Sequence, residues 1–254
     1  LGISAGMIKN KFVIKVLFRL EKWVYKNSDT ISTCTIGQLK NINSKGIPTE
    51  KITWIPDWID NSNLVTYDKA VASKLFNNFK GKKIISFIGN IGALQYPMVF
   101  IKTMKLLSKN NKVHFLFIGD GIMLSKLRFK VAELNLSNVD FLGRVKREQI
   151  PELMSMSTAL VANYLPDKHL NLYIPGKLFE YAISKKPIIM GAKGDAEIFI
   201  NKYQLGIVVP PSDPEAFKKA ILKIVEGSYS FNPKINNFLK DYSIENVTKK
   251  YDLI

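Results

Sequence analysis

Short β-branched and aromatic runs alternate with amphipathic stretches from about residue 82 to residue 226. The runs expected to form strands are Lys83–Ile88, Val113–Ile118, Val139–Phe141, Thr158–Ala162, Pro187–Met190 and Ile207–Val209. The spacing of apolar residues between them predicts helices near 97–109, 122–135, 146–156, 176–184, 195–203 and 213–226. Strands that alternate with helices form βαβ units, so the pattern predicts a doubly wound α/β domain whose mainly parallel sheet is covered on both faces.

The loops that follow these strands are the first candidates for a binding site. In a doubly wound sheet, ligands bind outside the carboxyl ends of the strands, where successive connections diverge. The loops after Ile88, Ile118, Phe141, Ala162 and Met190 should therefore share one rim. Most of the notable glycines fall in these loops, and glycine lets the backbone turn tightly and approach a ligand closely.

The first 65 residues do not form a complete unit of the same kind. Their pattern predicts an amphipathic helix over 8–26, a strand over 29–35, a helix to about residue 45 and a strand over 51–55. So few elements bury too little surface for an independent core. We therefore expect three parts: residues 1–65 as the tail of a preceding domain with its crossover, residues 66–230 as the complete domain, and residues 231–254 as a C-terminal helix that crosses back.

The stretch over residues 8–26 carries many basic residues among apolar ones. The basic residues are Lys9, Lys11, Lys15, Arg19, Lys22 and Lys26. The apolar residues between them are Phe12, Val13, Val16, Leu17, Leu20 and Trp23. Such a helix can lie in an anionic membrane surface, or it can bury its apolar face against another domain. Burial is favoured, because helix amphipathicity normally serves a core.

Composition narrows the class of protein and its partners. The 254 residues are 46% hydrophobic, and 37 basic against 21 acidic residues give a net charge of +16. This charge suits a polyanion: nucleic acid, an anionic membrane or a phosphorylated substrate. Nucleic acid ranks last, because the basic residues are not interleaved with an aromatic stacking platform.

The cysteine and histidine content limits the kinds of site that the protein can contain and the compartment that suits it. The single cysteine, Cys34, excludes an intramolecular disulfide and fits a reducing compartment, and two widely spaced histidines give no zinc-ligand pattern. No uncharged apolar run is long enough to span a bilayer. We expect a cytoplasmic protein that binds no metal. In one interpretation, the protein lies peripherally at the inner face of the cytoplasmic membrane.

The segment that opens the predicted helix near 176–184 is the most informative about function. Pro175 and Gly176 begin a helix whose first turn offers free backbone N–H groups, and Lys177 adds a positive charge there. Glu180 lies three residues further on, on the same side of the helix. This short element could hold a phosphate and a neighbouring ribose. The alternative is a capped surface helix with an incidental ion pair.

Two more rim loops carry candidate ligand groups. Gly89–Gly92, which includes Asn90, is a turn that can approach a phosphate, although a purely structural strand-to-helix turn is equally compatible with it. Arg144 can meet an oxyanion and the backbone of Val145 can pair with a base edge, whereas the alternative is an arginine that caps a surface loop. Asp120 is interpreted as a turn or N-cap residue, His114 as a packed residue and His169 as a loop residue.

Taken together, these elements resemble the C-terminal half of retaining glycosyltransferases of family 4, which have the GT-B fold of two facing Rossmann-like domains. The segments that carry the resemblance are Glu21–Asp29, Ile55–Asp60, Gly89–Gly92, Phe141–Arg144 and Pro175–Tyr181. Within that family, the chain looks most similar to the branch that builds bacterial O-antigen and capsule repeats, including N-acetylfucosamine-type transferases. The resemblance thus implies one complete Rossmann-like domain preceded by the tail of a second.

The resemblance also implies roles for individual residues. Glu180 would hold the ribose hydroxyls, Gly176 and Lys177 the pyrophosphate, and Lys177 and Glu180 would be the catalytic pair. The donor-binding set would be Gly89, Asn90, Gly92, Arg144, Val145, Gly176, Lys177 and Glu180. The implied partners are a nucleotide-sugar donor, expected to be a UDP-sugar, and a polyprenyl-diphosphate-linked or saccharide acceptor. The implied reaction is front-face transfer with retention, without a metal or other cofactor.

Three departures from the family pattern qualify these roles. Leu172 stands where members usually carry the first acid of a Glu-x7-Glu pair, and Asn90 and Gln95 lie where many carry Arg and Lys. Most of the first Rossmann domain also has no counterpart in the chain. We therefore expect a chain that binds a nucleotide sugar but does not transfer it efficiently by itself. The rivals are a sugar-nucleotide epimerase, for which acid and base residues are missing, and a non-catalytic donor-binding subunit.

Overall fold

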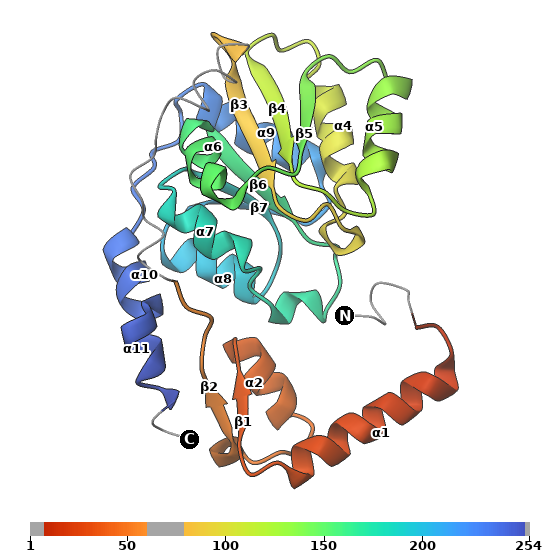
Figure 1. Cartoon of the computed structure of the whole chain (residues 1–254), viewed down its shortest axis with the longest axis vertical. Helices are drawn as coiled ribbons and strands as arrows, with labels where there is room; N and C mark the ends of the chain where they lie inside the picture. Colours follow the sequence, from red (N-terminus) through yellow and green to blue (C-terminus); the bar gives the residue numbers. More distant parts are fainter. Residues whose placement is uncertain (1–7, 60–78, 252–254) are drawn as a thin grey trace.

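The computed structural model of the chain describes residues 8–59 and 79–251. Figure 1 shows a larger upper part, built on one sheet with helices packed around it, and a smaller lower part with two short strands. The end of the predicted crossover, at Asp60, lies outside the described residues.

The upper part contains a six-stranded sheet. Its strands are β3 (Lys83–Ile88), β4 (Val113–Ile118), β5 (Val139–Gly143), β6 (Ala159–Asn163), β7 (Ile188–Gly191) and β8 (Gly206–Val209). They lie in the order β5-β4-β3-β6-β7-β8, and every neighbouring pair is parallel. The first strand of this sheet, β3, therefore lies in its middle. Strands β4 and β5 extend the sheet on one side, and β6, β7 and β8 extend it on the other. This confirms the predicted doubly wound fold and places its switch point between β3 and β6.

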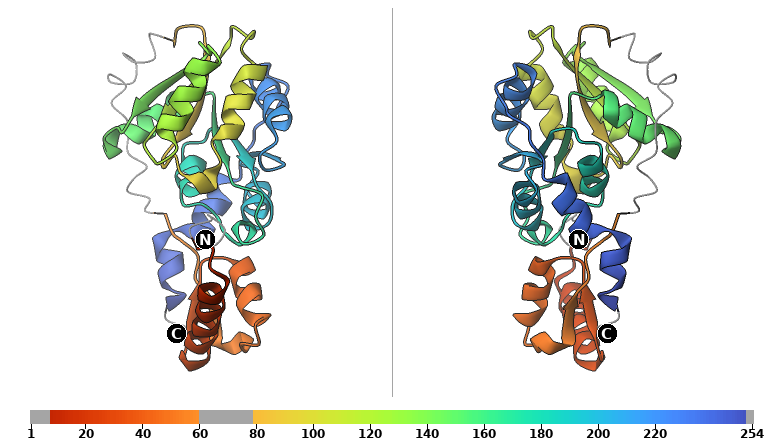
Figure 2. Two further views of the ribbon diagram at one scale, coloured as in Figure 1. Left: turned by 90° about the vertical axis from the view of Figure 1, so that its right-hand side faces the viewer. Right: turned by 90° about the vertical axis from the view of Figure 1, so that its left-hand side faces the viewer.

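Helices cover both faces of this sheet. They are α4 (Met98–Leu106), α5 (Leu124–Glu133), α6 (Ile150–Met156), α7 (Lys177–Ile183), α8 (Asp195–Lys202), α9 (Pro214–Val225) and α10 (Ile235–Tyr242). Helices α4, α5 and α9 pack on one face, and α6, α7, α8 and α10 pack on the other (Figure 2). The central strands are buried on both faces, which explains why their sequences are nearly continuous apolar runs.

Short 3-10 turns connect several of these elements. They are η4 (Ala93–Gln95), η5 (Arg147–Gln149) and η6 (Leu170–Leu172), while a further turn, η1 (Thr49–Lys51), belongs to the lower part. Each predicted strand and helix of the larger part is present, with ends that differ from the prediction by up to four residues.

The lower part is built from α1 (Lys11–Asn27), β1 (Ile31–Thr33), α2 (Ile36–Asn43) and β2 (Ile52–Trp54). The two strands are parallel and shorter than predicted, and the core around them consists of four isoleucines, Ile31, Ile42, Ile47 and Ile52. A two-stranded parallel sheet with so small a core has little stability of its own.

Helix α1 leaves its apolar face in solvent. No residue of α1 is buried, and its large apolar side chains from Phe12 to Val24, apart from Ile14, are between 37% and 74% exposed. In Figure 1 the helix extends sideways from the lower part, at the lower right of the molecule. The helix itself was predicted correctly from its pattern, and among the described residues nothing covers this face.

The C-terminal segment links the two parts. Helices α10 and α11 (Ile244–Thr248) run from the upper sheet down beside the lower part (Figure 1). The Ile59 amide donates to the Tyr242 carbonyl at 2.8 Å, and Lys250 Nζ lies 3.5 Å from the centre of the Trp54 ring. A direct contact adds to this link, because the Gly37 amide donates to Asp195 Oδ2 at 2.9 Å. Of the helices in the described ranges, none has both the length and the apolar character that crossing a membrane requires.

Candidate functional site

The loops at the carboxyl ends of the strands are tied together by backbone hydrogen bonds. The Gly89 amide donates to the Ile118 carbonyl, and the Gly119 amide donates to the Gly143 carbonyl, both at 2.8 Å. The Leu165 amide, after β6, donates to the Leu94 carbonyl at 2.9 Å. These bonds confirm that the loops after β3, β4, β5 and β6 share one rim. The rim spans the switch point between β3 and β6, where this fold class opens a crevice.

Lys177 reaches into this crevice from the start of α7. Its Nζ atom is buried and has no hydrogen-bond partner among the described residues. It lies 4.1 Å from the centre of the Phe87 ring, and a Cβ built on Gly89 would lie 3.3 Å from it. The ammonium group is therefore held directly beside the glycine loop, and it lies over the face of an aromatic ring.

Burial makes this ammonium group unusual. Desolvation lowers the pKa of Lys177 to about 8, and the charge of Glu180 opposes part of that shift. A buried charge without a partner is unfavourable, and native structures keep such groups chiefly where a ligand or reaction uses them. A phosphate at the loop would supply the missing partner.

Glu180 lies near the same crevice but points outward. Its side chain is 53% exposed, and its Oε1 atom lies 4.0 Å from a guanidinium nitrogen of Arg147. Lys177 and Glu180 both start on one side of α7, as their spacing predicts, but the Lys177 ammonium group is buried whereas the Glu180 carboxylate is exposed. Gly176 is the N-cap residue of α7, a helix of seven residues. This helix is too short to contribute much of a helix dipole.

Arg144 and Val145 lie on the rim beyond β5. The Arg144 side chain is 83% exposed, and its Nε donates to Asp120 Oδ2 at 3.2 Å. The Val145 side chain packs against the core cluster on the α7 face, so only its backbone can face a ligand. Asp120 also accepts from the Gly121 amide at 2.7 Å, as expected for a turn residue.

At its Gly92 end, the loop from Gly89 to Gly92 is crowded by two amide side chains. A Cβ built on Gly92 would lie 2.9 Å from Asn90 Nδ2 and 2.7 Å from Gln95 Oε1. Leu172, in place of a first acid, lies in η6, where its carbonyl accepts from Thr35 Oγ1 at 2.7 Å. Lys177 Nζ, beside Gly89, is therefore the cation that the described contacts place at this loop.

Tyr181 and Arg147 contact residues of the candidate site but were not among the predicted site residues. The Tyr181 hydroxyl contacts both backbone groups of Ile88, at 2.8 and 2.9 Å. A signal was available, because Tyr181 follows Lys177 by four residues and so shares its helix face. For Arg147, which comes near Glu180 from η5, the sequence offers no comparable signal.

The two histidines lie where the sequence places them. His114 is buried in β4 and its Nε2 is 2.8 Å from Asp140 Oδ2, while burial lowers the pKa of the ring. His169 lies in the loop before η6, and its amide donates to Asp167. Across 8–59 and 79–251, no group of three or more His, Cys, Asp or Glu side chains is arranged to hold a metal ion.

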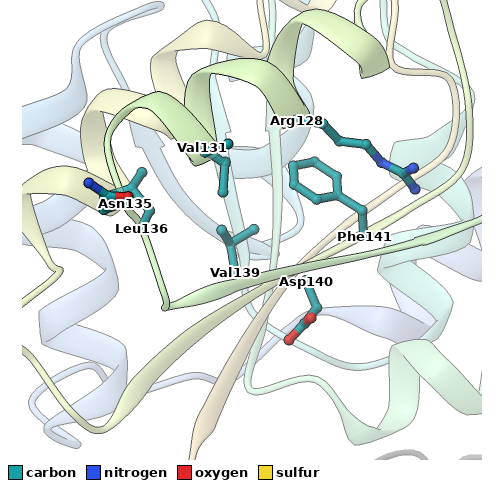
Figure 3. A pocket seen from close by; sticks show the side chains of 8 residues that line it. Arg128, Val131, Asn135, Leu136, Val139, Asp140 and Phe141 are labelled. Atoms are coloured by element: carbon teal, nitrogen blue, oxygen red, sulfur yellow. The ribbon is translucent and has the colours of Figure 1, made fainter.

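A separate cavity of about 660 Å³ lies along the outer edge of the sheet. Figure 3 shows it between α5 and β5. Its lining residues are Arg128, Val131, Ala132, Asn135, Leu136, Val139, Asp140 and Phe141. None of the residues expected to bind a donor lines it, and it contains no buried unpaired charge. The chemistry therefore favours the rim between β3 and β6 as the functional site.

Solved structures of other proteins share this fold. A structure of Alr3699/HepE from Anabaena in complex with UDP superposes with a TM-score of 0.75 over 89% of this chain and 63% of that one, at 14% sequence identity. The neighbouring structures are GT-B glycosyltransferases, and the α/β fold with its parallel sheet matches theirs.

Curated proteins of known or assigned activity are similar in sequence. The chain is 26% identical over 229 residues to the probable glycosyltransferase WbjE of Pseudomonas aeruginosa, covering 88% of this chain and 56% of that protein. It is 25% identical over 180 residues to an α-1,4-N-acetyl-D-galactosaminyltransferase of Campylobacter jejuni, covering 69% and 48%. The chain thus spans about half the length of these relatives.

A family model settles the assignment at the level of the family. The model for glycosyl transferases group 1 matches residues 69–243, which include the whole six-stranded sheet and its rim. The chain belongs to the group 1 glycosyl transferases.

Proposed function

We propose that the chain is the donor-binding half of a retaining glycosyltransferase of family 4 that uses a UDP-sugar. The acceptor would be a lipid-linked or saccharide acceptor in the synthesis of a bacterial surface polysaccharide. Two relatives favour these partners: the name of the Campylobacter jejuni protein describes a saccharide on PP-undecaprenol, and the Anabaena structure contains UDP.

One observation carries this proposal: the buried, unpartnered Lys177 ammonium group beside Gly89 at the switch point of the sheet. A diphosphate placed against the Gly89–Gly92 loop would neutralise that charge. The ribose would then lie toward Glu180, and the base toward Arg144 and the Val145 backbone. A panel of UDP-, GDP- and ADP-sugars, ranked by the thermal stabilisation each gives, tests the donor: UDP-sugars should stabilise the chain most.

The reaction follows from this placement. The bond between the sugar C1 and the diphosphate oxygen breaks, and the acceptor oxygen bonds C1 on the same face. The acceptor proton passes to the departing diphosphate. Lys177 would stabilise the negative charge that develops on the leaving group, so positioning and electrostatics would supply most of the rate enhancement.

Glu180→Gln is expected to weaken the recognition of the ribose. The carboxylate can accept hydrogen bonds from both ribose hydroxyls, and a hydrogen bond to a charged group contributes about 1.5–3 kcal/mol. The wild-type chain should therefore prefer UDP over 2′-deoxy-UDP by roughly tenfold or more. The variant should lose most of that preference. Calorimetric Kd values for the two nucleotides give the comparison.

Glu148→Gln is the matched control, because it removes the same charge from an exposed position next to Arg147. It should leave the preference unchanged. Equal preferences in Glu180→Gln and the wild-type chain would remove Glu180 from the ribose site.

We further propose that residues 1–65 continue an acceptor-side domain, that residues 66–230 form the donor domain, and that residues 231–254 cross back between them. The four-isoleucine core and the exposed face of α1 favour this division, because both lack cover that further α/β structure would supply. An anionic membrane is the other candidate cover for α1, given its row of lysines.

The isolated chain is accordingly expected to bind donor with little transfer. With a UDP-sugar and a polyprenyl-diphosphate saccharide, turnover should be at least about a hundredfold below that of the same chain preceded by an acceptor-side α/β domain from a relative. Product formation by chromatography is the measurement. Full turnover by the isolated chain would contradict the division. Donor binding with no gain on adding that domain would favour the alternative, a non-catalytic donor-binding subunit.

A further inference from the structure

The end of strand β3 has an unusual hydrogen-bonding arrangement. Strand β3 pairs with β4 along its whole length, from Lys83 to Ile88, but with β6 only at Ile85 and Ser86. Beyond Ser86 the two strands separate, which opens the crevice at the switch point.

The separation leaves Ile88 without a strand partner on one side. Backbone groups of successive residues in a strand point to opposite sides, and the Gly89 amide donates to Ile118 in β4. The N–H and C=O of Ile88 therefore face the β6 side, where the ladder has ended. Buried backbone groups without partners are strongly unfavourable.

Tyr181 of α7 supplies both missing partners. The Ile88 amide donates to the Tyr181 hydroxyl at 2.8 Å, and that hydroxyl donates to the Ile88 carbonyl at 2.9 Å. The Tyr181 side chain is fully buried, and burial raises its pKa, so the hydroxyl keeps its proton and can act as donor and acceptor together. One side chain thus replaces the two backbone hydrogen bonds that Ile88 would otherwise make with a neighbouring strand.

The same contact joins the two halves of the rim. Ile88 immediately precedes Gly89, and Tyr181 lies on the helix that begins with Lys177. We propose that the Tyr181 hydroxyl is a positioning group: it holds β3 and β6 apart at the switch point and fixes the glycine loop relative to the Lys177 ammonium group. This inference rests on the proposed donor site and adds a residue that does not itself touch the donor.

Tyr181→Phe tests the proposal because it removes the hydroxyl and keeps the ring. In the free chain, the Ile88 amide should exchange its hydrogen at least about tenfold faster, while amides within β4 stay protected. The Kd for UDP, measured far below the unfolding temperature, should rise roughly tenfold. The pH above which this Kd begins to rise should be higher than in the wild-type chain, because water that enters beside Ile88 would hydrate Lys177 Nζ and raise its pKa.

Tyr203→Phe is the matched control. Tyr203 is equally buried, and its hydroxyl donates to Asp241 in the α8–α10 region, away from the rim. This variant should lower the unfolding temperature and leave the Ile88 exchange rate, the UDP Kd and its pH dependence unchanged. A general loss of stability would affect both variants alike.

The outcomes distinguish a failure of the Tyr181 role from a failure of the proposed donor site. If the wild-type chain binds UDP and Tyr181→Phe binds it equally well, or if the Ile88 amide exchanges at its normal rate, the role of Tyr181 is wrong and the donor site stands. If the folded wild-type chain binds no UDP, the donor site and the positioning role both fail. Should Tyr181→Phe not fold, the wild-type chain still decides: a slowly exchanging Tyr181 hydroxyl proton with a nuclear Overhauser contact to the Ile88 amide is required, and its absence overturns the proposal.

Discussion

Lys177→Met is expected to weaken UDP binding about a hundredfold and, at the same time, to stabilise the free chain. The loss of affinity follows from removing a buried charged donor from the diphosphate, which is worth about 1.5–3 kcal/mol. The gain in stability follows from removing an ammonium group whose Nζ is buried and unpartnered. Calorimetry for the Kd and thermal unfolding for the stability give the two opposite changes.

The effect on stability has a defined dependence on pH. Folding lowers the pKa of Lys177 from 10.5 to about 8, so the unfolded chain holds the proton more tightly. Below pH 8 both states are protonated and the full cost is present, on the order of 3 kcal/mol. That cost is relieved as the pH rises from about 8 to 10.5. The stabilisation by Lys177→Met should therefore be largest at neutral pH and fade at alkaline pH.

The same titration predicts the pH dependence of binding. As Lys177 loses its proton above pH 8, the Kd of the wild-type chain for UDP should rise toward tenfold per pH unit, whereas the Kd of Lys177→Met should stay nearly flat. Lys219→Met, on the exposed side of α9, removes a lysine without these consequences. If Lys177→Met and Lys219→Met gave the same Kd, Lys177 would not contact the nucleotide.

Gly119→Ala is expected to destabilise the chain by about 3 kcal/mol or more and to weaken UDP binding with it. A Cβ at Gly119 would lie 2.0 Å from the Gly89 carbonyl oxygen, and the backbone φ of +131° is unfavourable for alanine. The clash is with backbone atoms, so the glycine loop itself has to move. The unfolding temperature should fall by roughly 6–12 °C.

Gly227→Ala separates the clash from the backbone strain. Gly227 also has a positive φ, +75°, but no atom lies within 4 Å of the position that an alanine Cβ would take there. Its substitution should cost about 1 kcal/mol, and the UDP Kd should not change. Equal shifts in unfolding temperature for the two variants would show that the loops after β3 and β4 are not packed as described.

The fold was predictable because its signals are local. The alternation of buried β-branched runs with amphipathic stretches fixes a doubly wound sheet, and the sheet brings the rim loops together. The ends of the strands were harder to predict, because side chains just outside a strand can form hydrogen bonds with the backbone of the neighbouring strand. Thr158, for example, was assigned to a strand, but its hydroxyl accepts from the Ile84 amide just before β6 begins.

The candidate site was predictable only in part. Glycine loops and Lys177 stand out in the sequence, but contacts between distant residues do not. The pairing of Arg144 with Asp120 depends on two strands ending side by side. The role of Tyr181 depends on where β3 and β6 separate, and no spacing along the chain encodes that point.

A calorimetric titration of the folded wild-type chain with UDP at pH 7 tests the proposed donor site most directly. If Lys177 holds the diphosphate, UDP should bind saturably at a single site, with an affinity that weakens above pH 8 as Lys177 loses its proton. No binding at millimolar UDP, by a chain that unfolds cooperatively on heating, would contradict that proposal.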